Sequence, residues 1–243
     1  MGDGSVLPPW GKLFAIRNVL LSIKPTRPLI HLSVYGSWSG WALSELCKDL
    51  GYEFIMAYPK SQKYPEQMLE KVDKCIALKP NMMSILYNKV GSIAKEKDYV
   101  RLPYAFDHNA YIETQRQRLK DVKKQLEFDH LVVSSGSGVT CLGLLLEHEP
   151  WPSLFEPENK RTFHTVCVSN EETIKKKFSN HQVYSSEQIE IIKSEFEFDD
   201  MMLKYETPFP CNQFWDKKAW YWLEKNISKF KGNILFWNLG GLW

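Results

Sequence analysis

A glycine- and serine-rich segment at 134–140 has the composition of an anion-binding turn. It follows the apolar run 131–133, and a helical pattern begins directly after it. A strand that turns into a helix in this way offers free backbone N–H groups and the positive helix end to an anion, usually a phosphate. The alternative is a plain tight turn. The candidate phosphate ligands are Ser135, Gly136, Ser137, Gly138, Val139 and Thr140.

Two common nucleotide-binding motifs do not fit this segment. The dinucleotide fingerprint requires a third glycine at the position that Cys141 occupies. A P-loop ends in Gly-Lys followed by Ser or Thr, and the segment contains no such ending. The pattern therefore indicates a phosphate without indicating a nucleotide.

A second loop of similar composition follows the apolar run 29–34. It contains Ser37, Trp38 and Ser39, and it leads into a helical pattern at 41–49. Ligands of α/β sheets bind at the carboxyl ends of the strands, so two such loops can converge on one ligand. The alternative is a turn in which Ser37 or Ser39 caps the helix.

Lys12 stands at the beginning of a segment with helical apolar spacing, formed by Leu13, Ile16, Val19 and Leu20. The charge of an ammonium group at that end opposes the helix dipole, which disfavours the protonated form. An amine with this property suits a lysine that forms a Schiff base. The alternative is an ordinary solvated surface lysine.

The C-terminal part of the chain carries a carboxylate and a glycine pair in similar positions. Asp216 stands at the beginning of the helical pattern 215–226, and the apolar run 233–238 ends in Leu239, Gly240 and Gly241. This arrangement indicates a further loop at the ligand-binding edge of a sheet. For Asp216 the alternative is a helix-capping or N-terminal charge.

Short apolar runs alternate with amphipathic segments along the chain, a pattern typical of βαβ units around a mostly parallel sheet. The expected strands are 29–34, 53–58, 128–134, 163–169 and 233–238. The expected helices are 41–49, 66–78, 110–126, 139–148, 171–178 and 215–226. Proline-containing stretches at 149–157 and 205–214 are expected to be loops.

The composition excludes several classes of function. The 31 basic residues nearly balance the 29 acidic ones, so nothing in the composition favours nucleic-acid binding. The five cysteines and six histidines are dispersed without metal-ligand spacing, so we expect reduced thiols and no metal site. No run approaches the ~18 apolar residues of a membrane span, and no secretory signal is recognisable. We therefore expect a cytoplasmic protein.

Taken in order, these segments resemble the fold-type-II, tryptophan-synthase-β-like enzymes that depend on pyridoxal 5'-phosphate (PLP). The resemblance is strongest to the 1-aminocyclopropane-1-carboxylate (ACC) deaminase and D-cysteine desulfhydrase family. That family's Gly-Asn-Lys resembles Gly11-Lys12, and its Gly-Ser-Gly-Gly-Thr phosphate loop resembles 136–140. Its Gln-Ser-Asn-His loop, its Tyr-Glu-Gly-Lys helix start and its terminal Gly-Gly strand resemble 36–39, 215–218 and 235–241.

The resemblance implies a role for each matched residue. Lys12 would hold PLP covalently and move the α-proton, and Ser37 would lie next to the substrate carboxylate. Asp216 would lie beside the pyridine nitrogen, where a carboxylate keeps the ring protonated. The cofactor-binding residues that the resemblance implies are Lys12, Trp38, Ser135, Gly136, Ser137, Gly138, Val139, Thr140, Asp216, Leu239 and Gly240.

The chain also departs from the family pattern. Trp38 replaces an asparagine, Ser39 a histidine, Trp215 a tyrosine and Lys217 a glycine, and the chain is shorter than the family's. Two functions therefore stand side by side. The first is a PLP-dependent lyase or deaminase for a small amino acid, similar to ACC deaminase or D-cysteine desulfhydrase. The second is a degenerate relative that binds a ligand or partner without turnover.

The resemblance implies two three-layer α/β/α domains with mostly parallel sheets and a cofactor cleft between them. We expect a small domain at 18–105 and a large cofactor-binding domain formed by 1–17 and 106–243. The expected partner is a small amino-acid substrate, with no nucleic acid and no membrane, and the expected assembly is a homodimer.

Overall fold

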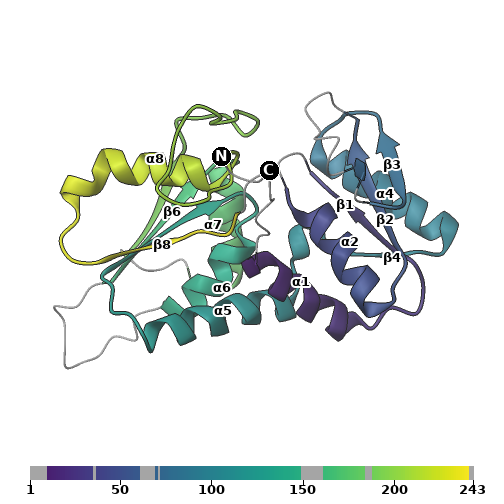
Figure 1. Ribbon diagram of the computed structural model, residues 1–243, viewed down its shortest axis with the longest axis horizontal. Coiled ribbons are helices and arrows are strands. Elements are labelled where there is room, and N and C mark those ends of the chain that lie inside the picture. Colours follow the sequence, from purple (N-terminus) through teal and green to yellow (C-terminus); the bar gives the residue numbers. More distant parts are fainter. Residues whose placement is uncertain are drawn as a thin grey trace. The chain divides into compact units, whose positions relative to one another are not determined.

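The computed structural model describes residues 10–34, 37–60, 69–70, 72–148, 161–183 and 188–240. The chain divides into two units. The N-terminal unit is Trp10–Tyr111, and the described part of the C-terminal unit runs from Ile112 to Gly240. Each unit contains its own four-stranded sheet (Figure 1). The functional assignment of 1–17 to the cofactor-binding domain stays a prediction.

The sheet of the N-terminal unit is parallel throughout and has the strand order β3-β2-β1-β4. These strands are β1 (Leu29–Leu32), β2 (Phe54–Pro59), β3 (Cys75–Leu78) and β4 (Val100–Arg101). The helices are α1 (Trp10–Ile23), α2 (Ser39–Leu50) and α4 (Met83–Lys97), with a 3-10 turn η1 (Tyr104–Phe106).

Alternate residues of the central strands face opposite sides of this sheet. Ile30 and Leu32 of β1 pack with Leu86 and Val90 of α4 in one buried cluster. His31 lies between them in sequence and therefore faces the other side, where its register partner on β2 is Met56. That side of the unit contains α2, since a Cβ on Gly40 would contact the side chain of Met56.

The sheet of the C-terminal unit is also parallel, with the order β7-β6-β5-β8. Its strands are β5 (His130–Ser135), β6 (Thr162–Cys167), β7 (Ile189–Lys193) and β8 (Ile234–Trp237). Its helices are α5 (Asn109–Lys123), which begins at the unit boundary, α6 (Val139–His148), α7 (Glu171–Asn180) and α8 (Asp216–Asn226), followed by η2 (Ile227–Lys229).

Helices cover both faces of this second sheet. Figure 1 shows α8 on one side of it, with α5 and α6 on the other. Leu131, Val132 and Val133 of β5 are consequently all fully buried, although successive residues of a strand point to opposite faces. The two-unit, parallel α/β fold expected from the sequence is confirmed.

Single elements differ from the expectation. The predicted helix 66–78 is wrong at its end, where β3 pairs with β2; residues 61–68 and Lys71 lie outside the described ranges. Helix α4 and strands β4 and β7 were not anticipated by the pattern. The predicted loop 149–157 also lies outside the described residues, whereas 205–214 is irregular as predicted. Among the described helices, none is long and apolar enough to cross a membrane.

Candidate functional site

The glycine-rich turn lies where β5 passes into α6, at the carboxyl end of the central strand of its sheet. Gly138 has a φ of +79°, in the left-handed region that favours glycine. Gly136 lies under the indole of Trp215, because a Cβ there would overlap the six-membered ring. The hydroxyl of Ser169 donates a hydrogen bond to the carbonyl of Gly136. The turn is thus fixed from two sides, with Gly136 and Thr140 half-buried.

Ser135 supplies a hydroxyl group that the protein itself does not fully use. Its Oγ is buried and has no oxygen or nitrogen partner within the described part of the chain, and it interacts with the Cys141 thiol. Burial raises the pKa of that thiol to about 11, so Cys141 stays protonated at neutral pH and is not a nucleophile. A buried hydroxyl at the edge of an anion-binding turn suits a ligand oxygen.

Asp216 is a buried carboxylate at the beginning of α8, with 1% of its surface exposed. Ser134 Oγ donates to Asp216 Oδ1 over 2.6 Å, which joins this helix start to the end of β5. Asn212 orders the turn before the helix, because its Oδ1 accepts from the backbone N–H groups of Phe214 and Trp215. The carboxylate is therefore held at the same sheet edge as the glycine-rich turn.

Gly240 packs directly against this carboxylate. It follows β8, the neighbour of β5, and a Cβ at this position would overlap Asp216 Oδ2 and the Cβ of Asn212. Leu239 beside it is half-buried. Within the C-terminal unit, the structure thus brings the turn 135–140, Asp216 and Gly240 together at one edge of the sheet.

Two buried lysines hold the irregular segment before α8. Lys217 Nζ donates to the carbonyls of Met202, over 3.3 Å, and Tyr205. Lys218 Nζ donates to the carbonyls of Glu197 and Phe198. Burial lowers the pKa of Lys218 to about 8, against the opposing effect of nearby carboxylates. Lys217, which replaces a family glycine, therefore has a structural use here.

The other predicted residues lie in the N-terminal unit. Lys12 is half-buried on α1. Ser37 and Trp38 are buried just before α2, and Ser37 Oγ donates to Ser39 Oγ over 2.9 Å and accepts from the Ser39 backbone N–H. Ser37 thus orders the turn before α2, whose N-cap is Trp38 and which has no side-chain cap hydrogen bond. Tyr35 and Gly36, also in this loop, lie outside the described residues.

His31 is a residue of this region that sequence reasoning missed. It is 3% exposed on β1, its ring stacks on Phe106 at 4.6 Å, and its buried Nδ1 has no hydrogen-bond partner among the described residues. Burial, together with a smaller effect of the nearby charge of Lys12, lowers the pKa of His31 to about 3. The imidazole is therefore neutral at physiological pH.

We expect His31 to make the protein sensitive to acid. Its pKa is lower in the folded state than in the unfolded state, so below about pH 6.5 the unfolded chain binds one proton more and stability falls. A difference of one bound proton lowers the free energy of unfolding by about 1.4 kcal/mol per pH unit. The loss between pH 6.5 and about pH 4.5 is therefore about 2 to 3 kcal/mol. Denaturant unfolding over this range should show a shallower pH dependence for His31→Phe. Equal slopes for both proteins would contradict the assignment.

Gly138→Val should abolish retention of a phosphorylated ligand while the fold survives. A β-branched residue is strained at a positive φ, so the turn must change shape and redirect its N–H groups. Gly51→Val is the matched control, because Gly51 also has a left-handed φ, +71°, but ends α2 with open space around it. Both variants should lose stability, and only Gly138→Val should lose PLP in an equilibrium-binding assay. Equal retention by both variants would remove this turn from the site.

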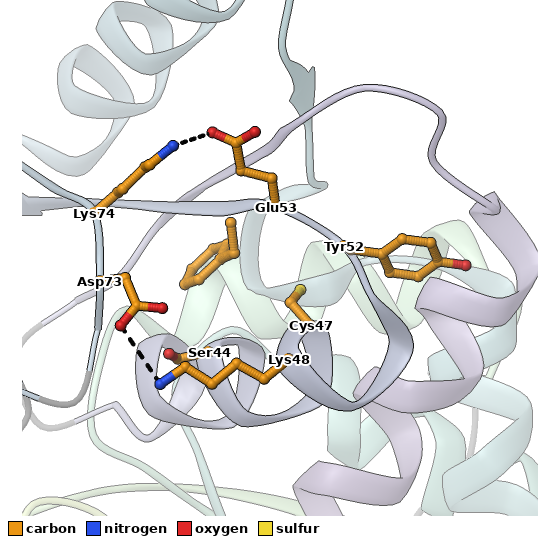
Figure 2. Close-up of a pocket in the computed structure, with 8 residues that line it drawn as sticks. Ser44, Cys47, Lys48, Tyr52, Glu53, Asp73 and Lys74 are labelled. Carbon is orange, nitrogen blue, oxygen red and sulfur yellow. Dashed lines mark hydrogen bonds and ion pairs between the residues drawn. The ribbon is translucent and has the colours of Figure 1, made fainter.

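The described structure also has a shallow pocket elsewhere, in the N-terminal unit. Figure 2 shows its lining, including the ion pairs Lys74–Glu53 and Lys48–Asp73, the latter 3.6 Å long. It lies beside Phe54, the first residue of β2, and so at the opposite end of the strands from the loops considered above. It is not the candidate site. The described residues contain no group of three or more His, Cys, Asp or Glu side chains placed to hold a metal ion.

Solved structures place this fold in a known class. A structure described as an ACC deaminase homologue superposes with a TM-score of 0.71 at 17% identity, covering 93% of this chain and 79% of that chain. A mutant of O-ureido-L-serine synthase with O-ureido-L-serine bound gives a TM-score of 0.70 at 13% identity, covering 96% and 78%. A threonine deaminase from T.th. gives 0.66 at 9%, covering 93% and 81%. The chain has the fold of the fold-type-II PLP-dependent enzymes, as the sequence resemblance implied.

A relative is also found by sequence. The chain is 24% identical over 249 residues to the glycyl-dTMP PLP-dependent decarboxylase of Pseudomonas phage M6. The alignment covers 93% of this chain and 87% of the phage protein. No family model matches the chain.

Proposed function

We propose that this protein is a PLP-dependent enzyme that breaks a bond at the α-carbon of an amino-acid substrate. One observation carries the proposal: a buried carboxylate, Asp216, and an anion-binding turn, 135–140, lie together at one sheet edge. These residues fit the cofactor, since the turn offers N–H donors and a spare buried hydroxyl to a phosphate. The close packing of Gly240 on Asp216 leaves room only for a residue without a side chain.

Each residue would have a defined task. PLP, when bound, supplies an electron sink for the charge that develops at the α-carbon. The turn 135–140 holds the phosphate through backbone N–H groups, and Asp216 keeps a proton on the pyridine nitrogen. Lys12 binds the cofactor covalently through its amine and moves the proton at the α-carbon. Lys12 belongs to the N-terminal unit, and the turn and Asp216 belong to the C-terminal unit.

The first candidate for the reaction is loss of the α-carboxylate as CO₂. The phage relative that aligns with 93% of the chain is named as a decarboxylase of glycyl-dTMP, a glycyl group linked to a nucleotide. A glycyl group has no β-substituent to eliminate. Decarboxylation also needs no acid group on the enzyme beyond those already present, and Trp215, which lacks the hydroxyl of the family tyrosine, is compatible with it.

The second candidate is deamination of a small amino acid, with ACC and D-cysteine as the substrates that the sequence resemblance suggests. Ser37, which matches the family serine beside the substrate carboxylate, is retained. Trp215 is the observation against it, because an indole N–H only donates a hydrogen bond, whereas a phenol also accepts one and can transfer its proton. We further propose that the protein is a cytoplasmic homodimer without nucleic-acid or membrane partners. Sedimentation of the purified protein would test whether it is a dimer.

The experiment that separates the candidates is a product assay with the PLP-loaded protein. Carboxyl-labelled glycine, a nucleotide that carries a glycine moiety with its carboxylate free, ACC and D-cysteine would be scored for labelled CO₂, ammonia, keto acid and sulfide. We expect CO₂ without ammonia. Ammonia with a keto acid would establish the deaminase, and bound PLP without turnover of any substrate would favour a ligand-binding relative.

A further inference from the structure

The connection from β6 to α7 forms a wall along the anion-binding turn. Ser169, just after β6, donates to the Gly136 carbonyl, and the Val168 N–H donates to the Ser135 carbonyl over 2.9 Å. The Gly136 carbonyl and the Ser137 N–H belong to one planar trans peptide, so they point in opposite directions. Drawing the carbonyl toward Ser169 therefore turns the Ser137 N–H to the other side, away from β6.

Helix α7 contributes the second part of this wall. A Cβ placed on Gly138 would lie 3.4 Å from Lys177 Cδ and 3.6 Å from the nearest carbon of Ile174. The aliphatic stem of Lys177 thus runs along the turn, and its ammonium group lies only two bonds beyond that contact. Lys177 is half-buried, as expected for a lysine that packs its stem and keeps its charged end in a polar region.

The other lysines of α7 are placed differently. Lys175 forms ion pairs with Glu172, at 2.9 Å, and Glu171, at 3.7 Å. Lys176 is exposed. No atom of Lys175 or Lys176 is among the three that lie nearest to a Cβ built on Gly138. Lys177 is therefore the cation that α7 places beside the turn.

We propose that Lys177 is a phosphate-binding residue of this site, which rests on the proposed function. A phosphate ester carries close to two negative charges at neutral pH, whereas a helix N-terminus offers about half a positive charge. The turn has no lysine or arginine of its own between residues 134 and 142. The Lys177 ammonium supplies the missing full charge from the neighbouring helix.

The test compares Lys177→Met with Lys176→Met. Methionine keeps an apolar stem against Gly138 and removes the charge, and Lys176 is the matched surface control. We expect Lys177→Met to bind PLP about 10-fold more weakly than the parent, as for one lost charge-assisted contact. Affinity for pyridoxal, which lacks the phosphate, should not change in either variant. Inorganic phosphate should compete with PLP less well in Lys177→Met, and Lys177→Arg should restore both affinities.

Thermal melting of each variant shows whether the fold is intact, and the Arg variant provides the same test should the Met variant melt early. PLP affinities that are equal in the Lys177→Met and Lys176→Met proteins would overturn the inference while leaving the proposed function standing. Equal losses for PLP and pyridoxal would also overturn it, because the effect would then not involve phosphate. A parent protein that bound no PLP would sink the proposed function, and this inference with it.

Discussion

Replacing Lys12 with alanine should abolish the yellow colour that we expect the parent protein to acquire with PLP. The colour requires a covalent imine between the cofactor and an amine, and Lys12 is the amine that the sequence resemblance assigns. Turnover should fall by at least ~10³-fold, because the same amine moves the proton at the α-carbon. Absorbance in the visible region and a single-turnover assay measure the two effects.

Lys89→Ala provides the control for this experiment. Lys89 is an exposed lysine on α4 of the same unit and has no assigned role, so its loss should leave both colour and turnover unchanged. A yellow Lys12→Ala protein with near-normal turnover would return Lys12 to the alternative of an ordinary surface lysine. Free primary amines added to the Lys12→Ala protein should partly restore turnover if the site is otherwise intact.

Asp216→Asn should leave PLP binding intact and slow exchange of the α-proton by ~10²-fold or more. Asparagine keeps the shape and the acceptor for Ser134 Oγ, but it removes the negative charge that holds a proton on the pyridine nitrogen. A factor of this size corresponds to about 2.7 kcal/mol in the transition state. Deuterium exchange from solvent into an accepted amino acid measures the rate directly.

Exchange as fast as that of the parent would make Asp216 a structural carboxylate at the beginning of α8. The next residue to consider from the sequence would be Asn238, at the end of β8. In the structure, Asn238 is exposed and its Nδ2 donates to the carbonyl of Pro210 over 2.6 Å. Its amide is therefore already used, which strengthens the assignment of Asp216.

The strands that could be predicted from the sequence are mainly those in the middle of each sheet. β1, β2, β5 and β6 are flanked by strands on both sides and covered by helices, so nearly all of their residues are apolar or buried. Three of the four edge strands, β3, β4 and β7, were missed. β3 is largely exposed and β7 half-buried, and their place depends on pairing with distant segments, which local periodicity does not reveal.

Helix α4 was missed although its sequence is amphipathic. Its buried residues are Leu86, Val90 and Ala94, and Met83, Tyr87 and Ile93 pack beside them against the same core cluster. The exposed Met82 and Ile85 interrupt the contrast between the apolar and polar faces at the beginning of the helix.

The candidate site could be predicted where its residues belong to contiguous motifs. The turn 135–140 and the Asp216 helix start were recognisable in this way, and the structure brings these two together within one unit. His31, Ser169 and Lys177 were not recognisable. Each of them contacts a residue that is distant in the chain, as Lys177 contacts the position of Gly138. A lysine on a charged helix also has no distinguishing pattern in the sequence.

The most direct test is to find where the cofactor is attached and whether the attachment depends on the phosphate turn. The PLP-treated protein would be reduced with borohydride, which makes the imine permanent, and its peptides analysed by mass spectrometry. We expect the pyridoxyl-phosphate mass on Lys12 in the parent and in Gly51→Val, and its loss in Gly138→Val. Labelling of scattered surface lysines, or labelling of Lys12 that is unchanged in Gly138→Val, would contradict the roles proposed for Lys12 and for the turn 135–140.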